Sequence, residues 1–413
     1  MNNPPPLSAL SGRKILFVVF EYPSSDTAGY HTYNRWVLTT LVALGAQVHL
    51  LVLTDRYKKW HDRLDDITGT AITAPGLFVW RGHALVWGPR AWLGWWWRRS
   101  PLARCRQASQ GQAHIGRWCT PRERATASAA ASVLQPDLVL LDTLFCTPMA
   151  ADLIGCPSAV VAHDVFSERV RELSLAGLRP HPQVDVQTER TALARAQAVI
   201  AICEGDAATL RHLLPASQPV FCFAPDPLPT SPLPPRRAAT GAPRLFYMGS
   251  AAHHNAHGIE WFVREVWPRL RLRQPNIELV LAGDVGAPWA HRRVPGLLVL
   301  GRVDKPAQAA AGCSLAIDPV QAGSGVKLKI LSYLALGLPC VTTPAGATGL
   351  DAYAAALFVA DGPKAFCDGV LTALQEGGTG DWYRRLVADA QAQREQARYG
   401  LAQELLPLMY ARP

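Results

Sequence analysis

The sequence predicts an α/β protein with two doubly wound parallel-sheet domains that face each other across a cleft. Three observations predict this fold. The chain has 413 residues, which is too long for one ordinary core and is typical of two domains of roughly 200 residues each. Short apolar runs alternate with helical patterns along the chain, as in parallel sheets covered by helices. A proline-rich stretch near the middle separates two such series.

The first series begins with a βαβ unit. Residues 14–20, KILFVVF, form a continuous apolar run rich in β-branched and aromatic side chains, which predicts a buried strand. A polar loop is expected next, and then a helix at 35–45 that ends in glycine and a strand at 47–53. Further strands are expected at 136–142 and 157–164, and both end in polar residues. These polar ends would lie at the sheet edge where ligands bind.

The proline-rich stretch at 224–243 predicts a stiff, extended linker. After it the alternation of strands and helices resumes, so the linker divides the chain. We expect an N-terminal domain at 1–223, a C-terminal domain at 244–380, and a last helical segment at 381–413 that could pack back across the N-terminal domain.

Composition narrows the class of protein. The net charge of +9 favours anionic partners such as phosphates or an acidic lipid surface. Nucleic acid is not expected as a partner, because RNA-binding aromatic signatures and zinc-finger spacings are missing from the sequence. Nine scattered cysteines without a C-x-x-C pair indicate a reducing cytoplasm rather than a disulfide framework or a zinc site. With no apolar run near the ~20 residues of a membrane span, we expect a cytoplasmic protein, either free or peripheral on the inner face of the cell membrane.

The turns after the linker resemble those of a known family. In order they read YMGSAAHHNAHGIEWF, NIELVLAGD, VLGRVDK, AGSGVKLKILSYLALG and PAGATGL. Over roughly residues 244–362 this series resembles the donor-binding domain of retaining GT-B glycosyltransferases, in particular the large family that includes sucrose synthase and bacterial mannosyl- and glucosyltransferases. The resemblance implies two Rossmann-like domains and transfer of a hexose from a nucleotide diphosphate sugar to an acceptor. It also implies retention of configuration, no metal, and no cofactor beyond the nucleotide-sugar co-substrate.

The segment AGSGVKLKIL carries a physical argument of its own. Gly323 and Gly325 allow the backbone to approach a ligand closely, and the free N–H groups at the start of the next helix face an anion. A cation at Lys327 opposes the helix dipole unless an anion lies nearby, so we predict that Lys327 contacts a pyrophosphate. The alternative is a plain strand–turn–helix with an exposed lysine. Lys329 is expected to point elsewhere and to stay solvated.

Two serines stand where relatives commonly carry glutamates. Ser324 and Ser332 match the two ends of the family's Glu-x7-Glu pattern. In relatives the second glutamate accepts the ribose hydroxyls. A serine offers only a neutral hydrogen bond, worth about 1 kcal/mol against about 1.5–3 kcal/mol for a charged one. Nucleotide affinity should therefore be weaker, unless another group supplies the contact.

The resemblance implies the rest of the donor site. Ser250 and His257 stand where many relatives have an arginine and a lysine that are directed at the diphosphate. The loop between them is predicted to bind the donor, with a polar surface turn as the alternative. The full set of predicted donor-binding residues is Gly29, Gly249, Ser250, His254, Asn255, Arg302, Val303, Gly323, Ser324, Gly325, Lys327, Ser332 and Gly346.

In the N-terminal half, His163 and Asp164 follow a predicted strand. Relatives often have a histidine here, close to the transferred sugar, so both residues are predicted to be catalytic; a purely structural histidine is the alternative. Gly29 lies in a loop that aligns with the glycine loop of relatives, which reaches under the donor phosphates. Glu189 matches a recurrent acidic position and is expected to be structural.

Residues 79–100, VWRGHALVWGPRAWLGWWWRRS, alternate aromatic and cationic side chains. This pattern suits a lipid–water interface, so the segment could contact a membrane or a lipid-linked acceptor. It could equally pack as an elaborated N-terminal core or cover a neighbouring subunit, and both interpretations stay open.

The predicted function is glycosyl transfer from a nucleotide diphosphate sugar to a glycan or lipid-linked acceptor in envelope polysaccharide or glycolipid assembly. One alternative is another enzyme class on the same fold, a nucleotide-sugar epimerase or a phosphorylase. A second alternative is a degenerate GT-B binding subunit that has lost catalysis, because both glutamates and the usual basic pair are replaced.

Overall fold

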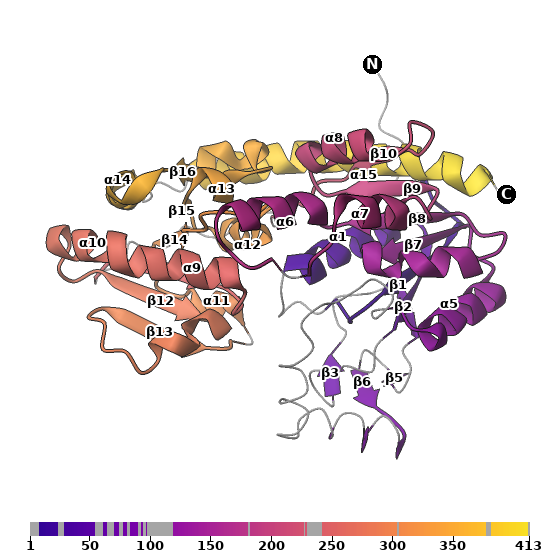
Figure 1. Cartoon of the computed structure of the whole chain (residues 1–413), viewed down its shortest axis with the longest axis horizontal. Helices are drawn as coiled ribbons and strands as arrows, with labels where there is room; N and C mark the ends of the chain where they lie inside the picture. Colours follow the sequence, from indigo (N-terminus) through magenta and orange to yellow (C-terminus); the bar gives the residue numbers. More distant parts are fainter. Residues whose placement is uncertain are drawn as a thin grey trace.

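The structure, a computed structural model, describes residues 8–23, 29–53, 61–63, 70–73, 77–80, 83–89, 92, 93, 96, 119–180, 182–226, 228, 242–303, 305–376 and 381–411. These residues form two parallel sheets, one from strands that precede the expected linker in the sequence and one from strands that follow it (Figure 1). Both sheets are covered by helices, so the predicted α/β class with two Rossmann-like domains is confirmed.

The N-terminal sheet has seven strands in the order β10-β9-β8-β7-β1-β2-β4, all paired in parallel. Its strands are β1 (Lys14–Val19), β2 (Gln47–Val52), β4 (Thr70–Thr73), β7 (Leu138–Asp142), β8 (Ser158–Ala162), β9 (Ala198–Ala201) and β10 (Val220–Cys222). Its helices are α1 (Gly29–Ala43), α5 (Pro121–Leu134), α6 (Phe166–Leu175), α7 (Val186–Leu193) and α8 (Glu204–Leu213), with a 3₁₀ helix η1 (Leu144–Asp152).

Helix α1 begins earlier than predicted. We expected a polar loop up to residue 34, but the helix starts at Gly29. The expectation was wrong because His31 and Asn34 are polar yet fully buried, at 1% and 0% exposure. Their side chains face polar groups at the ends of the strands and not solvent, as the site below shows.

The C-terminal sheet has six parallel strands in the order β13-β12-β11-β14-β15-β16. Its strands are β11 (Arg244–Met248), β12 (Glu278–Ala282), β13 (Leu297–Gly301), β14 (Leu315–Asp318), β15 (Cys340–Thr342) and β16 (Leu357–Val359). Its helices are α9 (His253–Trp261), α10 (Trp267–Arg273), α11 (Pro306–Ala309), α12 (Leu328–Ala335), α13 (Pro344–Ala347) and α14 (Gly362–Glu376), with the π turn η2 (Phe262–Val266) and the 3₁₀ helices η3 (Asp284–Trp289) and η4 (Asp351–Ala356).

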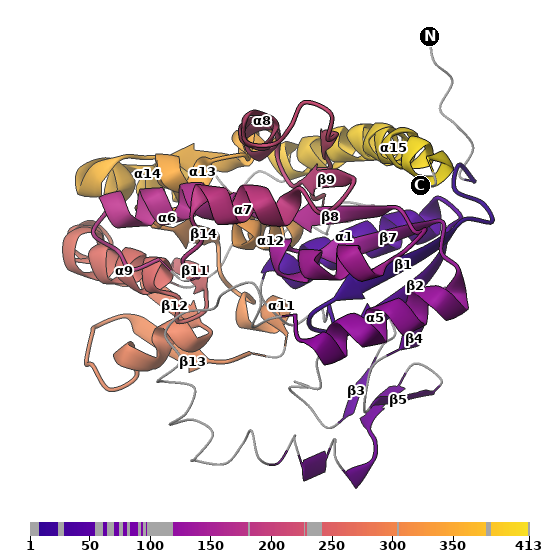
Figure 2. The same ribbon diagram turned by 45° about the vertical axis from the view of Figure 1, so that its right-hand side comes forward.

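The last helix, α15 (Asp381–Tyr410), starts beside the C-terminal domain and runs along the N-terminal one (Figures 1 and 2). Leu401 and Leu405 are buried in the core that includes β1. The guanidinium of Arg394, 6% exposed, donates hydrogen bonds to Asp226 Oδ2 at 2.6 Å and to the Leu228 carbonyl at 2.7 Å. These hydrogen bonds therefore hold α15 against Asp226 and Leu228, which follow the last strand of the N-terminal domain. Of the expected linker, residues 227 and 229–241 lie outside the described residues.

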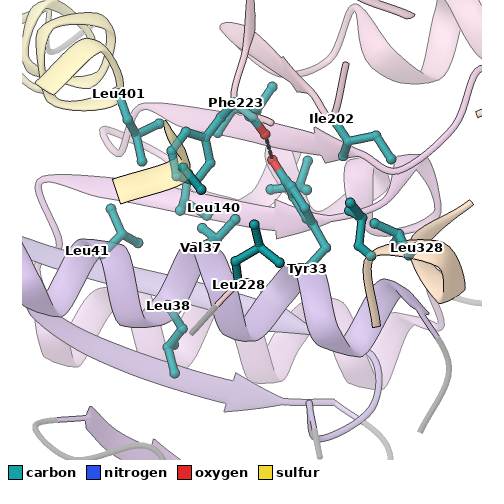
Figure 3. Packing of buried hydrophobic residues seen from close by; sticks show 14 of the residues in the cluster. Tyr33, Val37, Leu38, Leu41, Leu140, Ile202, Phe223, Leu228, Leu328 and Leu401 are labelled. Carbon is teal, nitrogen blue, oxygen red and sulfur yellow. Dashed lines mark hydrogen bonds between the residues drawn. The ribbon is translucent and has the colours of Figure 1, made fainter. Parts of the chain in front are cut away.

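The two domains share part of one core. Tyr33 of α1 is fully buried and donates a hydrogen bond to the Phe223 carbonyl at 2.7 Å. Figure 3 shows Tyr33 beside Leu328, the first residue of α12, which comes from the other domain. The labelled members of this cluster are Tyr33, Val37, Leu38, Leu41, Leu140, Ile202, Phe223, Leu228, Leu328 and Leu401. This shared apolar packing holds the starts of α1 and α12 together.

A small antiparallel sheet, β3 (His61–Arg63), β6 (His83–Val86) and β5 (Leu77–Trp80), lies beside the N-terminal domain (Figure 1). It contains the start of the tryptophan-rich stretch 79–100, of which residues 81–82, 90–91, 94–95 and 97–100 lie outside the described residues. Trp87 and Trp96 are 69% and 67% exposed, so these two side chains do not pack into the core of the chain. Within the described ranges, no helix is long and apolar enough to span a bilayer.

Candidate active site

Each sheet reverses its strand order at one point, between β1 and β7 in the N-terminal domain and between β11 and β14 in the C-terminal one. Parallel sheets bind ligands at the carboxyl ends of the strands beside such a point. In both domains a fully buried aspartate ends a strand there. Asp142 is the last residue of β7 and Asp318 the last residue of β14, and both are 0% exposed.

Asp318 is paired with Lys329. The Lys329 ammonium donates to Asp318 Oδ1 at 3.2 Å, to the Tyr247 hydroxyl oxygen at 3.1 Å and to Asn255 Oδ1. Burial acts to lower the pKa of Lys329, but Asp318 and Tyr247 outweigh it and raise that pKa. The expectation that Lys329 stays solvated is therefore wrong. The residue lies in the first turn of α12, and the fold turns this position towards the end of β14.

Lys327 lies against the loop of residues 323–325 that follows β14, called the glycine loop from here on. Its side chain is 8% exposed, and its ammonium donates to the carbonyls of Gly323 at 2.7 Å, Ser324 at 2.8 Å and Gly325 at 2.8 Å. Burial lowers the pKa of Lys327, against the opposing influence of Asp164 and Asp318. The alternative of an exposed lysine is wrong. The ammonium gives the loop its shape and places a positive charge directly behind it.

The two serines have different partners. Ser324 Oγ donates a hydrogen bond to Asp164 Oδ1 of the N-terminal domain at 2.7 Å. Ser332 Oγ donates at 3.2 Å to the Leu328 carbonyl one turn earlier in its own helix. Ser324 therefore joins the two domains, while the Ser332 hydroxyl is engaged within α12.

The loop after β11 lies against the same lysines. Asn255 Nδ2 donates to the Ser250 carbonyl at 3.3 Å and to Ser250 Oγ at 3.2 Å, while Asn255 Oδ1 accepts from Lys329. Burial lowers the pKa of His254 to about 3, with further contributions from Lys329, Arg169 and Lys327. The charges of Lys329, Arg169 and Lys327 thus reach His254, although Arg169 is paired with Asp164 and Lys329 with Asp318.

Position 249 has no room for a side chain, because neighbouring atoms lie too close. A Cβ at Gly249 would lie 2.9 Å from the Tyr247 ring, and one at Gly283 would lie 2.3 Å from the Gly249 carbonyl oxygen. Gly346, in the turn after β15, has the same property, since its Cβ would lie 2.0 Å from Thr342 Oγ1. The backbone of both predicted donor-binding glycines is therefore fixed by close packing.

Arg302 and Val303 lie at the carboxyl end of β13, the edge strand, two strands from the point where the sheet reverses its order. The Arg302 guanidinium forms two hydrogen bonds of 2.7 Å with the Asp284 carboxylate, and its side chain is 77% exposed. Val303 packs partly buried against the shared core. The Arg302 side chain is thus paired within its own domain, with the start of η3.

In the N-terminal domain, three groups donate to Asp142. His163 Nε2 lies 2.7 Å from Asp142 Oδ1, Asn34 Nδ2 lies 3.0 Å from the same oxygen, and the Phe20 amide lies 3.4 Å from Oδ2. His163 was predicted from the sequence, whereas Asp142 and Asn34 were not. The signal for Asp142 was its place as the polar end of a predicted strand; Asn34 was assigned to a loop.

Beside this network lie Glu21, Tyr30 and His31. The Tyr30 hydroxyl donates to Glu21 Oε2 at 3.0 Å, and His31 Nε2 lies 3.4 Å from the same oxygen. Burial, followed by the charge of Glu21, raises the pKa of Tyr30. Among the described residues, the buried atoms His31 Nδ1, Asn34 Oδ1 and His163 Nδ1 have no hydrogen-bond partner. Sequence reasoning also missed this group.

The domains meet at what we call the domain junction, formed by Gly29, Asp164, Ser324, Gly325 and Leu328. A Cβ at Gly29, the first residue of α1, would lie 2.8 Å from Leu328 Cβ, and a Cβ at Gly325 would lie 3.0 Å from Asp164 Oδ1. The start of α12 is therefore in contact with the start of α1, and the glycine loop is in contact with Asp164, so both join the C-terminal domain to the N-terminal one.

Two buried acidic residues, Glu189 and Asp206, have pKa values raised by burial, and both lie close enough to Asp164 for its charge to add to the shift. Glu189 is fully buried and accepts hydrogen bonds from the amides of Phe166 at 2.8 Å and Ser167 at 2.9 Å, so it caps α6 and has a structural role, as expected. Burial raises the pKa of Asp206 to about 6, and the charge of Asp164 adds to the shift. This side of the junction is acidic, in contrast to the region around His254.

Comparison with known structures fits this geometry. Sucrose-phosphate synthase from Thermosynechococcus elongatus matches with a TM-score of 0.64 at 14% identity, over 96% of this chain and 98% of the other. Anabaena HepE, solved in complex with UDP and glucose, matches with a TM-score of 0.60 at 14% identity, over 97% and 100%. A trehalose-6-phosphate structure from E. coli, bound with UDP-2-fluoro glucose, matches with a TM-score of 0.57 at 11% identity, over 96% and 99%. The fold is GT-B.

Residues 242–376, from β11 to the end of α14, match the family described as glycosyl transferases group 1. This match covers the GT-B domain that carries the glycine loop, Lys327 and Lys329. Among curated proteins, no sequence matches the chain. The resemblance read from the turns after the linker is therefore supported for the C-terminal GT-B domain, and the fold of the whole chain is shared with the structures named above.

Proposed function

We propose that this protein is a glycosyltransferase that moves a hexose from a nucleotide diphosphate sugar to a hydroxyl group of a glycan or lipid-linked acceptor. One observation carries the proposal: both domains converge on the glycine loop, where Ser324 donates to Asp164 of the N-terminal domain and Lys327 bonds the carbonyls of residues 323–325. Such a loop at the start of a helix is suited to a diphosphate. The glycosyl transferases group 1 match over 242–376 and the UDP ligands named for two structural neighbours support the same reaction.

The chemical task is to stabilise the diphosphate as the glycosidic bond breaks. We propose that the chain does this with fixed positive charge and without a metal cofactor. The starts of α12 and α1 lie together at the junction, and the N-terminal ends of helices favour anions. The Lys327 ammonium acts through the loop it closes, since its protons are already bonded to three carbonyls. Retention of anomeric configuration is part of this proposal.

Ser332 favours a second candidate, a GT-B subunit that binds nucleotide sugars without transferring them. Its hydroxyl is bonded to the Leu328 carbonyl and carries no charge for a ribose. Ser324 likewise donates to Asp164, where relatives commonly have a glutamate. Weak nucleotide binding without transfer is the behaviour this candidate predicts.

The first experiment is a thermal-shift series with UDP, GDP, ADP, CDP, dTDP and their common sugars. A ligand at about 100 times its dissociation constant stabilises the folded state by about 2.7 kcal/mol, which is readily measured. A shift with one nucleotide family identifies the donor, and release of the free nucleotide on adding candidate acceptors establishes transfer. A shift without release would favour the binding subunit, and no shift with any nucleotide would contradict both candidates.

We also propose a peripheral membrane contact on the cytoplasmic side, made through the tryptophan-rich stretch. Its support is the exposure of Trp87 and Trp96 and the net charge of +9. Co-sedimentation with anionic vesicles tests it, with a Trp87→Ser/Trp96→Ser variant as the comparison. Equal sedimentation of both proteins would contradict a contact through these side chains.

A further inference from the structure

The network around Asp142 constrains what its ligand can be. The carboxylate is fully buried and receives three donors: His163 Nε2 at 2.7 Å, Asn34 Nδ2 at 3.0 Å and the Phe20 amide at 3.4 Å. An ionised carboxylate can only accept hydrogen bonds. The proton of a neutral His163 must therefore be on Nε2, and the Asn34 amide must turn its NH₂ group towards Asp142.

Both side chains then present acceptors at their other ends. In His163 this is Nδ1 and in Asn34 it is Oδ1, and each is buried and unpaired within the described part of the chain. A buried polar atom without a partner is destabilising, so such atoms are normally satisfied by a ligand or by water. The group that satisfies these two atoms must donate hydrogen bonds. A sugar hydroxyl does so; a phosphate or carboxylate does not.

The histidine ring is also held in place. The ring of Tyr33 meets it edge to face, with centroids 5.4 Å apart and an angle of 87° between planes, and the Tyr33 hydroxyl is fixed on the Phe223 carbonyl. His163 is followed directly by Asp164, which contacts Ser324 of the glycine loop at 2.7 Å. The unpaired nitrogen therefore belongs to a residue that adjoins the domain junction.

We infer that Asp142 is a positioning residue, and this inference rests on the proposed transfer reaction. Asp142 fixes the Nε2–H tautomer of His163 and the orientation of Asn34. Both side chains then offer a hydrogen-bond acceptor to a substrate hydroxyl. The ligand at this point is a neutral polyol face of the donor sugar or the acceptor. An acidic group of the acceptor is excluded from contact with these two atoms.

The test is the tautomer of His163 in the ligand-free protein, and it does not depend on transferase activity. Protein labelled with ¹⁵N-histidine is studied at alkaline pH, where imidazole is neutral, and the His163 signals are assigned with His163→Gln. We expect a protonated Nε2 and an unprotonated Nδ1, and a mixture of tautomers in Asp142→Asn. Asp152→Asn, which changes a carboxylate paired with Arg124 outside the junction, should leave the tautomer unchanged. A wild-type Nδ1–H tautomer would overturn the inference, and so would an unaltered tautomer in a folded Asp142→Asn protein.

Once a donor is identified, a double-mutant cycle gives the second readout. Asp142→Asn and His163→Gln should each lower kcat/KM roughly ten- to a hundredfold, and the double variant should lose less than the two single losses combined, because Asp142 acts partly through His163. A rise in KM for the donor or for the acceptor shows which substrate carries the hydroxyl. Additive losses would contradict the positioning role. Failure to find any donor would count against the proposed function and leave the tautomer result standing.

Discussion

Asp318 and Asp142 occupy the same place in the two sheets, each ending a strand at the point where strand order reverses, yet their surroundings differ. Asp318 faces a lysine whose three protons are all bonded, to Asp318, Tyr247 and Asn255. Asp142 faces a histidine and an asparagine whose outer atoms stay unpaired in the described structure. Asp318 Oδ2 is itself buried without a partner among the described residues, so the difference lies in what faces the aspartate: a fully bonded ammonium in one domain, and two side chains with unpaired outer atoms in the other.

The two sides also differ in electrostatic field. On the C-terminal side, burial and the cations Lys329, Arg169 and Lys327 lower the pKa of His254. On the N-terminal side, burial and Asp164 raise the pKa of Asp206. A nucleotide sugar has matching asymmetry, with an anionic diphosphate at one end and a neutral polyol at the other. The contrast therefore predicts which half of a bound donor faces which domain.

The largest expected effect is the loss of stability caused by Lys329→Met, which removes the ion pair of Asp318. Removing one partner of a buried ion pair leaves an unpaired charge and costs about 3–5 kcal/mol, and Asp318 is fully buried. We expect a large fall in the melting temperature of the C-terminal domain, measured by calorimetry. Lys364→Met is the matched control, because Lys364 also pairs with an aspartate but is 91% exposed. Equal stability of the two variants would show that the Asp318 pair is not structural.

Lys327→Met should weaken ligand binding and also lower the stability of the folded protein. The substitution removes three hydrogen bonds to the carbonyls of residues 323–325 and the charge behind the loop. Because each charged hydrogen bond is worth about 1.5–3 kcal/mol, we expect the nucleotide to bind roughly a hundredfold more weakly by calorimetric titration. Lys305→Met, at an exposed lysine of the same domain, is the control. If Lys327→Met bound the nucleotide as tightly as the wild type does, the glycine loop would not be part of the donor site.

Much of this architecture could be predicted from the sequence. Continuous apolar runs identified the strands β1, β2, β7 and β8, because residues buried on both faces of a parallel sheet must be apolar. The glycine loop and the pair His163–Asp164 were also correctly predicted to follow the carboxyl ends of strands. Turn chemistry and strand ends are local features, and local features can be read from neighbouring residues.

The buried polar network could not be predicted in the same way. His31 and Asn34 were assigned to a loop and Lys329 to solvent, because a polar side chain read alone is expected to face water. For Asn34 and Lys329 the partners include residues more than seventy positions away, Asp142 for Asn34 and Asn255 for Lys329. Such pairs become visible only when the topology brings two strand ends together.

Ser324→Ala tests the contact that joins the two sides. The variant removes the hydrogen bond to Asp164, and loss of a bond to a charged group should raise the donor KM roughly tenfold. Asp164→Asn should have a similar effect, and the double variant should lose less than the sum of the two. Ser132→Ala, whose hydroxyl bonds only to the Ser128 carbonyl in an exposed helix turn, is the control. Strictly additive effects would mean that the two residues act separately.

The smallest expected effect is on the pH dependence of stability, where the two sides should respond in opposite directions. His254 has a pKa lowered to about 3 in the folded protein against about 6.5 unfolded. Below the unfolded value the unfolded chain binds more protons, so this group makes stability fall as pH falls from about 6.5 towards 3. Asp206 has a pKa raised to about 6 against about 3.9 unfolded. The folded chain binds more protons in that interval, so this group makes stability fall as pH rises from about 4 to 6.

Urea unfolding at pH 5 and pH 7.5 separates the two contributions. His254→Gln should lose less stability than the wild type on moving from pH 7.5 to pH 5, because it lacks the group that protonates on unfolding. Asp206→Asn should lose more, because it lacks the group that releases a proton on unfolding. Changes of the same sign in both variants would contradict the opposite pKa shifts of the two residues. Changes of opposite sign would confirm that the folded protein lowers the pKa of His254 and raises the pKa of Asp206, with burial as the main cause of both shifts.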